Sequence, residues 1–505
     1  MKVLLVYCNS MLENATPISI SQLSACLKQA GVTVELFDTT FYRYGRKSSM
    51  ETRIDALQIA PCPLNFIEGD IEKDFIKKIE TYGPDIIGFS MVEPTLNLAR
   101  RLLRCAKGLI KKNGIKVAVG GVHAVLSPET LENDEMIDYI SISEGEVAFV
   151  ELCRRIEKGL DVKEMTGFWI KDNGSWIKNQ RAPLVDINTL PGLDLSIFSQ
   201  GYLNKPIMGR NFRTISVETT RGCPYHCSYC ADRTLTEVFR PFGRWYRQKS
   251  MRRLESEFKE AIGKYNPDFV YIMSESFLSG SLKRVTDFAD IYRKFSIPFW
   301  FNTRPEDITE DKARLIKEIG CKRISIGLEH GNENYRKKYM YRNYSNSTFK
   351  RACGILADQG ISFSVNLIIG VPFDTREMIF EAVDLLREVK PQGVSTCIFN
   401  PYHGSDLRNV ALKEKMIEPD LIAEDFFQLD YYLHNNTISK EEVFGLFRTI
   451  PLYIEIGRSE EGRIKRAERL DREGNEAFAE LRGEFYKLKG WKLPDKTLHE
   501  DACNI

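Results

Sequence analysis

The chain has 505 residues, of which 43% are hydrophobic and 28% are charged, and its formal net charge is +1. Such a balance is typical of a globular protein of two to four domains, and it gives no electrostatic reason to expect nucleic-acid binding. The first residues become polar too soon for a signal peptide, and no run of about 18 apolar residues predicts a membrane span. We therefore expect a cytoplasmic protein with no nucleic-acid partner and no membrane span.

Strands and helices alternate over residues 1–165. Short apolar runs predict buried parallel strands at residues 3–6, 32–36, 86–89, 117–119 and 139–142. The alternation predicts a doubly wound, Rossmann-like α/β domain, in which ligands bind at the carboxyl ends of the strands. Residues near three of these ends form a candidate cofactor site, with the glycines of ordinary tight turns as the alternative explanation. They are Ser90, Gly120, Gly121, His123, Glu144 and Gly145.

Residues 166–210 predict a connection between two larger domains. The stretch from Gly167 to Lys178 has the pattern of a β-hairpin, with its turn at Asn173-Gly174. The part that follows Pro191 is expected to be a linker that ends near residue 210.

Three cysteines in one short run carry the clearest chemical signal. Cys223, Cys227 and Cys230 follow the spacing C-x3-C-x2-C, and no fourth cysteine lies nearby in the sequence. Soft thiolates on one loop favour a [4Fe–4S] cluster with one iron left open. A three-ligand zinc site and loop thiols without a role are the alternatives. Zinc would need His226 as a fourth ligand, and its adjacency to Cys227 makes tetrahedral geometry awkward.

Residues 211–407 predict a partial (β/α)6 TIM barrel. Strands are expected at residues 214–217, 269–273, 299–302, 323–327, 363–368 and 394–399, and the cysteine loop follows the first of them. Because TIM-barrel chemistry takes place at the carboxyl ends of the strands, residues there are candidates. They are Ser274, Glu275, Arg304, Glu329, Asn366 and Gly370. The structural alternatives are an ion pair between Arg304 and Glu329 and a plain turn at Gly370.

Residues 408–505 predict a mainly helical domain. Two apolar stripes have helical spacing. They are Val443, Leu446, Phe447 and Ile450, and Phe478, Leu481, Phe485 and Leu488. We expect this segment to cover the open side of the barrel, where substrate would enter.

The motif C-x3-C-x-aromatic-C, with Tyr229 as its aromatic residue, resembles the signature of radical S-adenosylmethionine (SAM) enzymes. The resemblance implies that the open iron binds SAM, which the reduced cluster cleaves to a 5′-deoxyadenosyl radical. An external electron donor such as flavodoxin or ferredoxin is an implied partner. The resemblance also assigns SAM contacts, with Arg304 and Glu329 as the best matches. These residues are Tyr229, Ser274, Glu275, Arg304, Glu329, Asn366 and Gly370.

The phrases IIGFS, VAVGGVHAVLSPE and YISISEGE resemble the cobalamin-binding domain that precedes the radical domain in B12-dependent radical SAM enzymes. The resemblance covers about residues 1–150. It implies cobalamin contacts at Ser90, Gly120, Gly121, His123, Glu144 and Gly145. His123 has a second possible role, which is to hold the segment before Pro128. A domain that keeps the fold without cobalamin is a further alternative.

The first loop departs from the pattern of many cobalamin proteins. It reads Cys8-Asn-Ser-Met-Leu-Glu-Asn-Ala-Thr16, without the motif Asp-x-His-x-x-Gly, and no histidine occurs before position 123. We therefore expect base-off cobalamin with no histidine ligand from this loop.

The leading hypothesis is a cobalamin-dependent radical SAM methyltransferase that acts on an unactivated carbon via a 5′-deoxyadenosyl radical and methylcobalamin. One alternative keeps both cofactors but forms a ring or rearranges the substrate without methyl transfer. A second is a non-catalytic cobalamin or SAM sensor. The expected substrate is a small molecule of natural-product type.

Overall fold

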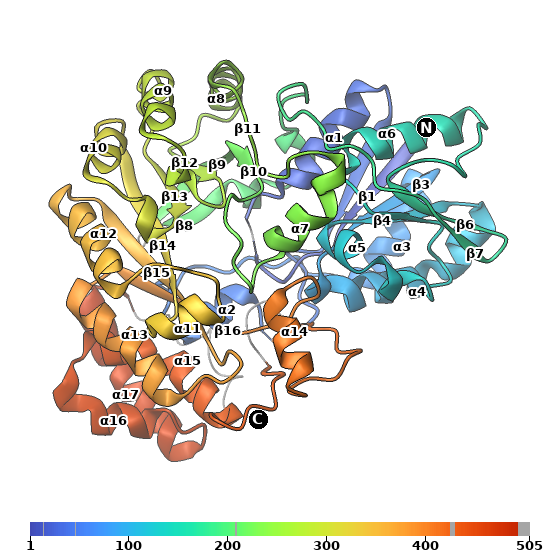
Figure 1. Ribbon diagram of the computed structural model, residues 1–505. Coiled ribbons are helices and arrows are strands. Elements are labelled where there is room, and N and C mark those ends of the chain that lie inside the picture. The colour runs from blue at the N-terminus through green and yellow to red at the C-terminus, as the bar shows by residue number, and fades with distance from the viewer. Residues whose placement is uncertain (14, 46, 208–209, 425–429, 493–505) are drawn as a thin grey trace.

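The structure is a computed structural model that describes residues 1–492, apart from residues 14, 46, 208–209 and 425–429. It consists of an N-terminal α/β lobe, a second lobe built on a curved sheet, and C-terminal helices beside the second lobe (Figure 1). The predicted α/β fold class is confirmed. The end of the predicted helical domain, residues 493–505, lies outside the described part of the chain.

The first lobe contains a sheet with the strand order β2-β1-β3-β4-β5-β6-β7. Its strands β1 to β5 are parallel and correspond to the predicted apolar runs. They are β1 Lys2–Tyr7, β2 Thr33–Asp38, β3 Ile86–Ser90, β4 Lys116–Gly120 and β5 Tyr139–Ser141. The helices of this lobe are α1 Ile18–Gln29, α2 Ser49–Asp55, α3 Ile71–Tyr82, α4 Leu96–Asn113, α5 Val122–Leu126 and α6 Gly145–Glu157.

The side chains of β1 show why helices cover both faces of this sheet. Val3 and Leu5 pack with residues of α1 and α6, whereas Leu4 and Val6 pack with residues of α3 and α4. Successive side chains of a strand point to opposite faces. An uninterrupted apolar run therefore needs cover on both faces, and each fully buried leucine or valine stabilises the fold by roughly 1.5–3 kcal/mol.

The predicted hairpin is confirmed. Strands β6 Phe168–Asp172 and β7 Ser175–Lys178 pair antiparallel, and the turn residues Asn173 and Gly174 have φ of 48° and 84°. β6 also pairs antiparallel with β5, so the hairpin extends the first sheet.

The second lobe contains the predicted partial barrel. Its parallel strands follow one another in chain order around the sheet. They are β9 Arg210–Glu218, β12 Phe269–Met273, β13 Phe299–Thr303, β14 Cys321–Glu329, β15 Ser362–Ile369 and β16 Gly393–Ile398. A further strand, β8 Asn204–Ile207, pairs antiparallel with β9 at the edge. The sequence did not predict this strand, because it is short and contains Pro206.

Helices cover the outer face of the barrel sheet (Figure 1). They are α8 Met251–Tyr265, α9 Leu282–Tyr292, α10 Glu310–Glu318, α12 Asn346–Asp358 and α13 Arg376–Val389. Two further helices of this lobe are α7 Ala231–Phe239 and α11 Glu333–Lys338. The helix α7 lies between the two lobes, where Leu235 and Phe239 pack against Val125 of the first lobe.

A segment of the first lobe also reaches the barrel. Ala56 and Leu57, which follow α2, belong to the apolar core of the second lobe. The Gln58 side chain donates to the carbonyl oxygen of Thr396 in β16 at 2.8 Å. The two lobes are therefore joined on more than one side.

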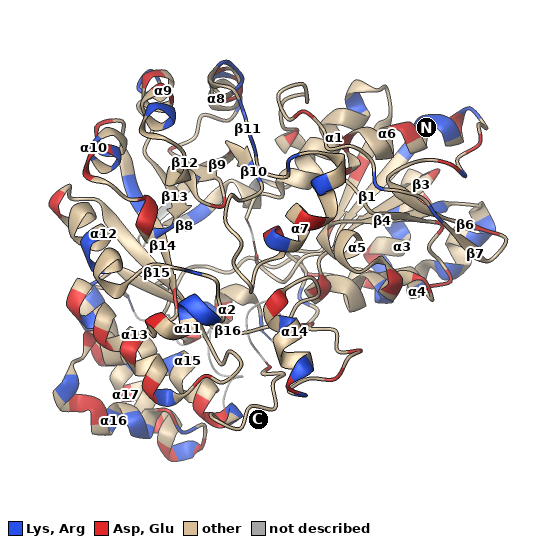
Figure 2. Cartoon of the chain, viewed as in Figure 1, with Lys and Arg blue, Asp and Glu red and all other residues tan. Residues whose placement is uncertain are grey.

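The C-terminal region is helical, as predicted, with α14 Asp406–Lys413, α15 Lys440–Glu455, α16 Glu461–Ala467 and α17 Arg472–Lys489. Both apolar stripes are buried except for Leu488, which is 63% exposed. Helix α15 packs against β16 and α13. Charged side chains gather on α16 and α17 (Figure 2). Among the described residues, no helix combines the length and the apolar character that a membrane span requires.

Candidate active site

A cavity of about 340 Å³ opens at the carboxyl ends of the strands of the first sheet. Its far wall comes from the second lobe and includes Arg221, Leu235 and Trp245. Five of the six residues predicted for this cofactor site line the cavity together. They are Ser90, Gly120, Gly121, Glu144 and Gly145.

Steric crowding accounts for the glycine at position 121. Gly121 has φ of +98°, and a Cβ atom there would lie 2.3 Å from the carbonyl oxygen of Met91. A side chain would therefore strain the backbone and collide with the loop after β3. The close approach of two loops is sufficient to explain this glycine, and its contact with cobalamin stays a prediction.

Glu144 is held by two arginines of the second lobe. Its carboxylate oxygens lie 3.0 Å from Arg221 Nη1 and 2.9 Å from Arg247 Nη1. Burial alone would raise the pKa of Glu144, but the two guanidinium groups hold it below its ordinary value. Arg221 also pairs with Glu146 and Glu218. Glu144 thus ties the two lobes together, and its role toward cobalamin stays a prediction.

His123 takes a different position from the other predicted residues. The described residues that line the cavity do not include it. Its Nε2 lies 2.9 Å from Thr130 Oγ1, in the turn Pro128–Leu131. The ring therefore contacts the turn that begins at Pro128, whereas the second role left open by the sequence placed it on the segment before Pro128.

The three cysteines share one loop between β10 Thr220–Arg221 and α7. Cys227 is buried, and the other two are partly exposed. In the described part of the chain, only one group of three His, Cys, Asp or Glu side chains has ligand atoms that all lie within 4.8 Å of one another. This group contains no cysteine, so the three sulfur atoms of the loop do not all lie within that distance. Zinc bound by three thiolates would hold their sulfur atoms about 3.8 Å apart. The loop therefore fits a cluster in which each thiolate binds its own iron better than it fits zinc.

Two arginines face the buried sulfur. Cys227 Sγ accepts hydrogen bonds from Arg304 Nη1 at 3.2 Å and from Arg342 Nη1 at 3.8 Å. Burial raises the pKa of Cys223 to about 12 and that of Cys230 well above its ordinary value. The two arginines place positive charge beside the Cys227 sulfur, which favours a thiolate at that position.

Arg304 and Glu329 do not pair with each other. Arg304 lies after β13, stacks on the Tyr225 ring at 3.8 Å and donates from Nε to Glu306 at 2.8 Å. Glu329 instead lies 3.6 Å from Arg342. The structural alternative of an ion pair between the two is therefore wrong, while their contact with SAM stays a prediction.

The backbone is irregular at the end of β14. Glu329 has φ of +67°, and the register with β15 shifts between Gly327 and Glu329. Such bulges re-aim side chains, and strained backbone of this kind concentrates at functional sites. Burial raises the pKa of Glu329, although the charge of Arg342 opposes the shift.

Ser274 and Glu275 line a second cavity, of about 290 Å³, which borders the first. Glu218, Arg221 and Trp245 line both of them. The side chain of Glu275 is open to this cavity but surrounded by protein. Desolvation by that protein raises the pKa of Glu275 to about 7, and the charges of Asp232 and Glu218 add to the shift. Ser274 lies 2.7 Å from Thr220 Oγ1.

The remaining predicted SAM residues lie in three places. Tyr229 accepts a hydrogen bond from Arg342 at 3.0 Å, beside the cluster loop. Asn366 lines a third cavity, of about 320 Å³, inside the barrel. The N–H of Gly370 donates to Asp374 at 2.8 Å, and a Cβ atom at Gly370 would lie 2.9 Å from the Tyr431 ring. A tight turn covered by the C-terminal region therefore accounts for Gly370.

Three residues central to this site were missed by sequence reasoning. Arg342 lies in a loop after α11, Asp232 pairs with Trp245 Nε1 at 2.7 Å, and Arg221 joins the lobes. Asp232 and Arg221 flank the cysteine motif in the sequence, so their position offered a signal. Arg342 had none, because only the folded chain brings it to Cys227.

Comparisons with known proteins agree with this geometry. The profile of the B12 binding domain matches residues 4–153, and that of the Radical SAM superfamily matches residues 217–386. An uncharacterized methyltransferase of Pyrococcus horikoshii is 24% identical over 350 residues, which cover 68% of this chain and 73% of that protein. An anaerobic magnesium-protoporphyrin IX monomethyl ester cyclase of Rubrivivax gelatinosus is also 24% identical over 350 residues, covering 67% and 60%.

A solved structure supports the fold over nearly the whole chain. The cobalamin-dependent SAM radical enzyme OxsB superposes with a TM-score of 0.65 and 18% identity, covering 97% of this chain and 72% of that one. The two profile matches show that the chain combines an N-terminal B12-binding domain with a radical SAM domain. Its cofactors are accordingly a [4Fe–4S] cluster, SAM and cobalamin.

Replacing Cys223, Cys227 and Cys230 together by alanine should abolish the cluster. Wild-type protein reconstituted without oxygen should bind about four irons and four sulfides, and the triple variant close to none. Cys353→Ala, which removes a buried thiol of α12, is the matched control and should bind iron like the wild type. A triple variant that still cleaved SAM would contradict the assignment.

Glu329→Gln and Arg304→Ala should weaken SAM cleavage while the iron content stays near four per chain. A hydrogen bond to a charged group is worth about 1.5–3 kcal/mol, so we expect a loss of about tenfold or more in 5′-deoxyadenosine formation. The exposed residue Glu310 provides the control Glu310→Gln, which should behave as wild type. Undiminished cleavage in both site variants would remove these residues from the site.

Proposed function

We propose that this chain is a cobalamin-dependent radical SAM methyltransferase that acts on an unactivated carbon of a small molecule. When bound, the cluster supplies one electron for SAM cleavage and cobalamin carries the methyl group. The residues of the chain position the cofactors and exclude water. The name of the Pyrococcus relative supports methyl transfer, and the low identity makes this a proposal.

The observation that carries this proposal is a series of three adjoining cavities. The first, at the end of the B12-binding sheet, shares Glu218, Arg221 and Trp245 with the second. The second shares Tyr271 and Asn302 with the third, inside the barrel. Adjoining cavities let a methyl carrier, SAM and a substrate carbon lie close together, as transfer between them requires.

The third cavity favours a substrate with an anionic group. Lys205, Arg323 and Arg53 contribute cations to its wall, and Glu13 is the one carboxylate among its described lining residues. Within the described part of the chain, neither Lys205 nor Arg323 has a side-chain hydrogen bond or ion pair. Buried charges are costly without partners, so we infer that a substrate carboxylate or phosphate supplies the partner.

An aromatic wall in the same cavity favours a flat or apolar substrate body. The rings of Tyr271 and Trp300 stack with centroids 4.1 Å apart and planes 17° apart. Trp300 Nε1 is buried and lacks a hydrogen-bond partner in the described structure, so it is free to donate to a ligand.

The electron donor would approach from the outer side of the cluster loop. A surface hollow there is lined by Cys223 and His226, and by the exposed arginines Arg240 and Arg244. Positive charge beside the partly exposed Cys223 suits an acidic one-electron donor such as flavodoxin or ferredoxin.

The alternative of ring formation without methyl transfer is favoured by the name of the Rubrivivax relative. The products of SAM separate the two reactions. A methyltransferase of this type should form S-adenosylhomocysteine as well as 5′-deoxyadenosine, and the former should appear only when cobalamin is supplied.

This difference can be measured by liquid chromatography and mass spectrometry on the reduced, reconstituted protein with SAM. Cobalamin-dependent S-adenosylhomocysteine supports methyl transfer. 5′-Deoxyadenosine without S-adenosylhomocysteine in either condition would favour the cyclase-like alternative. Absence of both products, with cluster and cobalamin bound, would favour a sensor.

Lys205→Met should stabilise the cofactor-free protein. Burial lowers the pKa of Lys205 to about 8, from 10.5 in the unfolded chain, although the charge of Glu13 opposes the shift. The folded state thus disfavours the charged form of Lys205. Burying that charge lowers the free energy of unfolding by about 3 kcal/mol below pH 8, and this effect disappears as the pH rises toward 10.5. We expect a higher urea midpoint for the variant at pH 7.

The pH dependence provides the check. Wild-type stability should gain a contribution between pH 8 and 10.5 that Lys205→Met lacks, measured by urea unfolding. Lys322→Met replaces an exposed lysine of β14 and serves as the control, with little change expected. A variant less stable than wild type at pH 7 would contradict the view that Lys205 is kept for a ligand.

A further inference from the structure

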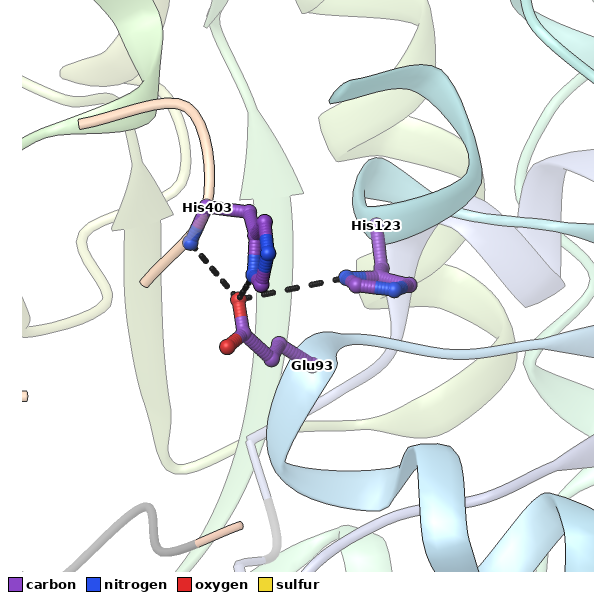
Figure 3. A group of neighbouring side chains, drawn as sticks. All are labelled: Glu93, His123 and His403. Atoms are coloured by element: carbon purple, nitrogen blue, oxygen red, sulfur yellow. Dashed lines mark hydrogen bonds and ion pairs between the residues drawn. The ribbon is translucent and has the colours of Figure 1, made fainter. Parts of the chain in front are cut away.

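We propose that Glu93, His123 and His403 form a binding site for a divalent transition-metal ion such as Zn²⁺ at the boundary between the two lobes. Glu93 lies in the turn after β3, His123 in α5, and His403 in the loop after β16. Figure 3 shows dashed contacts from one carboxylate oxygen of Glu93 to His403 and to His123. The three ligand atoms all lie within 4.8 Å of one another.

The distances suit one shared ion. Glu93 Oε2 lies 2.9 Å from His403 Nδ1 and 3.9 Å from His123 Nδ1. Ligands bound tetrahedrally to zinc at about 2.0–2.1 Å are about 3.3 Å apart, between these two values. The rings meet edge to face at 90°, so their nitrogens converge on the carboxylate rather than stack. Two imidazoles and one carboxylate form a common donor set for zinc and for iron(II).

The hydrogen bonds of Thr130 fix the tautomer of His123. Thr130 Oγ1 donates its proton to the carbonyl oxygen of Ser127 at 2.8 Å, so it can only accept from His123 Nε2 at 2.9 Å. The proton of the neutral ring is therefore on Nε2, and the lone pair of Nδ1 faces Glu93. A partner that orients the second ring nitrogen in this way is typical of metal-bound histidines.

His123 is shielded from solvent. The residue is 2% exposed, so water does not compete with a bound ion for its Nδ1 lone pair.

His403 offers the second imidazole nitrogen of the proposed site, and this atom has no hydrogen-bond partner in the described structure. Its Nδ1 is buried and forms no hydrogen bond in the described structure, although Glu93 Oε2 is 2.9 Å away. That oxygen already accepts the backbone N–H of His403 at 2.7 Å. The imidazole nitrogen is thus close to the carboxylate but is not satisfied by it, as expected for an atom that binds a third group.

The carboxylate itself lacks a full cationic partner. Glu93 is 4% exposed, and its described ion pairs are with the two histidines. Its other oxygen, Oε1, accepts the N–H of Ala423 at 2.9 Å. The cation Arg408 faces the group, yet in the described structure its guanidinium donates to the carbonyl oxygens of Pro401, Pro419 and Leu421. A metal ion would compensate this buried charge.

The site is separate from the cavities assigned to the cofactors and substrate, since none of its three residues is among their described lining residues. It takes two ligands from the first lobe and one from the second. Metal binding would therefore fasten the B12-binding domain to the end of the barrel, because an ion that binds the assembled lobes stabilises that assembly.

Zinc uptake by the full-length protein tests the proposal. Protein loaded with cluster and cobalamin is freed of other metal with a mild chelator, titrated with Zn²⁺ alone, desalted and analysed by mass spectrometry of the elements. We expect one zinc per chain, and zinc-edge X-ray absorption should show two imidazole ligands and no sulfur. Zinc should also raise the temperature of thermal unfolding.

Variants separate this site from the rest of the protein. His123→Ala and His403→Ala should weaken zinc binding at least 100-fold, and Thr130→Val, which keeps all three ligands, about tenfold. His434→Ala removes an exposed histidine and should bind zinc like the wild type. The Cys223/Cys227/Cys230→Ala variant should lose SAM cleavage yet still take up zinc, so this proposal and the proposed function can fail independently. Sulfur ligation, no uptake by the wild type, or undiminished binding in both histidine variants would overturn it.

Discussion

The relation between the two lobes depends on one buried cation. Arg221 lies 2.7 Å from Glu146, 3.0 Å from Glu144 and 3.1 Å from Glu218, so it faces carboxylates of both lobes at once. Burial opposes its charge, but the carboxylates hold the pKa of Arg221 well above its ordinary value. Removing one partner from a buried ionic group typically costs about 3–5 kcal/mol. The network therefore fixes the carboxyl end of the first sheet against the cysteine loop, two residues beyond Arg221.

This constraint explains why the cavities adjoin. Parallel sheets place their ligand sites at the carboxyl ends of their strands, and both lobes turn those ends toward each other. Trp245 borders both spaces and hydrogen bonds to Asp232 next to Cys230. One charge network thus positions the cobalamin side and the cluster side together. The charge of Glu218 helps to raise the pKa of Arg221 and also that of Glu275. The electrostatics of the two cavities are therefore linked.

The sequence was most informative where the signal is local. The parallel strands of both sheets, the hairpin at Asn173-Gly174 and the cysteine loop follow from apolar runs, turn residues and spacing. The packing of Leu57 into the barrel core and the approach of Arg342 to Cys227 depend on contacts distant in the chain, which no local pattern encodes. His123 shows the limit clearly: its motif was visible, but its partners come from three segments, and one of them, His403, is 280 positions away.

Two arginines of the barrel differ in whether the described structure supplies their hydrogen-bond partners. Arg336 is fully buried, yet it donates to the carbonyl oxygens of His330, Gly331 and Tyr344 and to Asn346, so the fold itself supplies its partners. Arg323 faces the barrel cavity without such partners in the described structure, and burial lowers its pKa. A folded chain gains nothing by desolvating a guanidinium that it leaves unpaired. The same argument applies to Lys205, and it is the reason for our proposal that a ligand from outside the chain completes the pairing in this cavity.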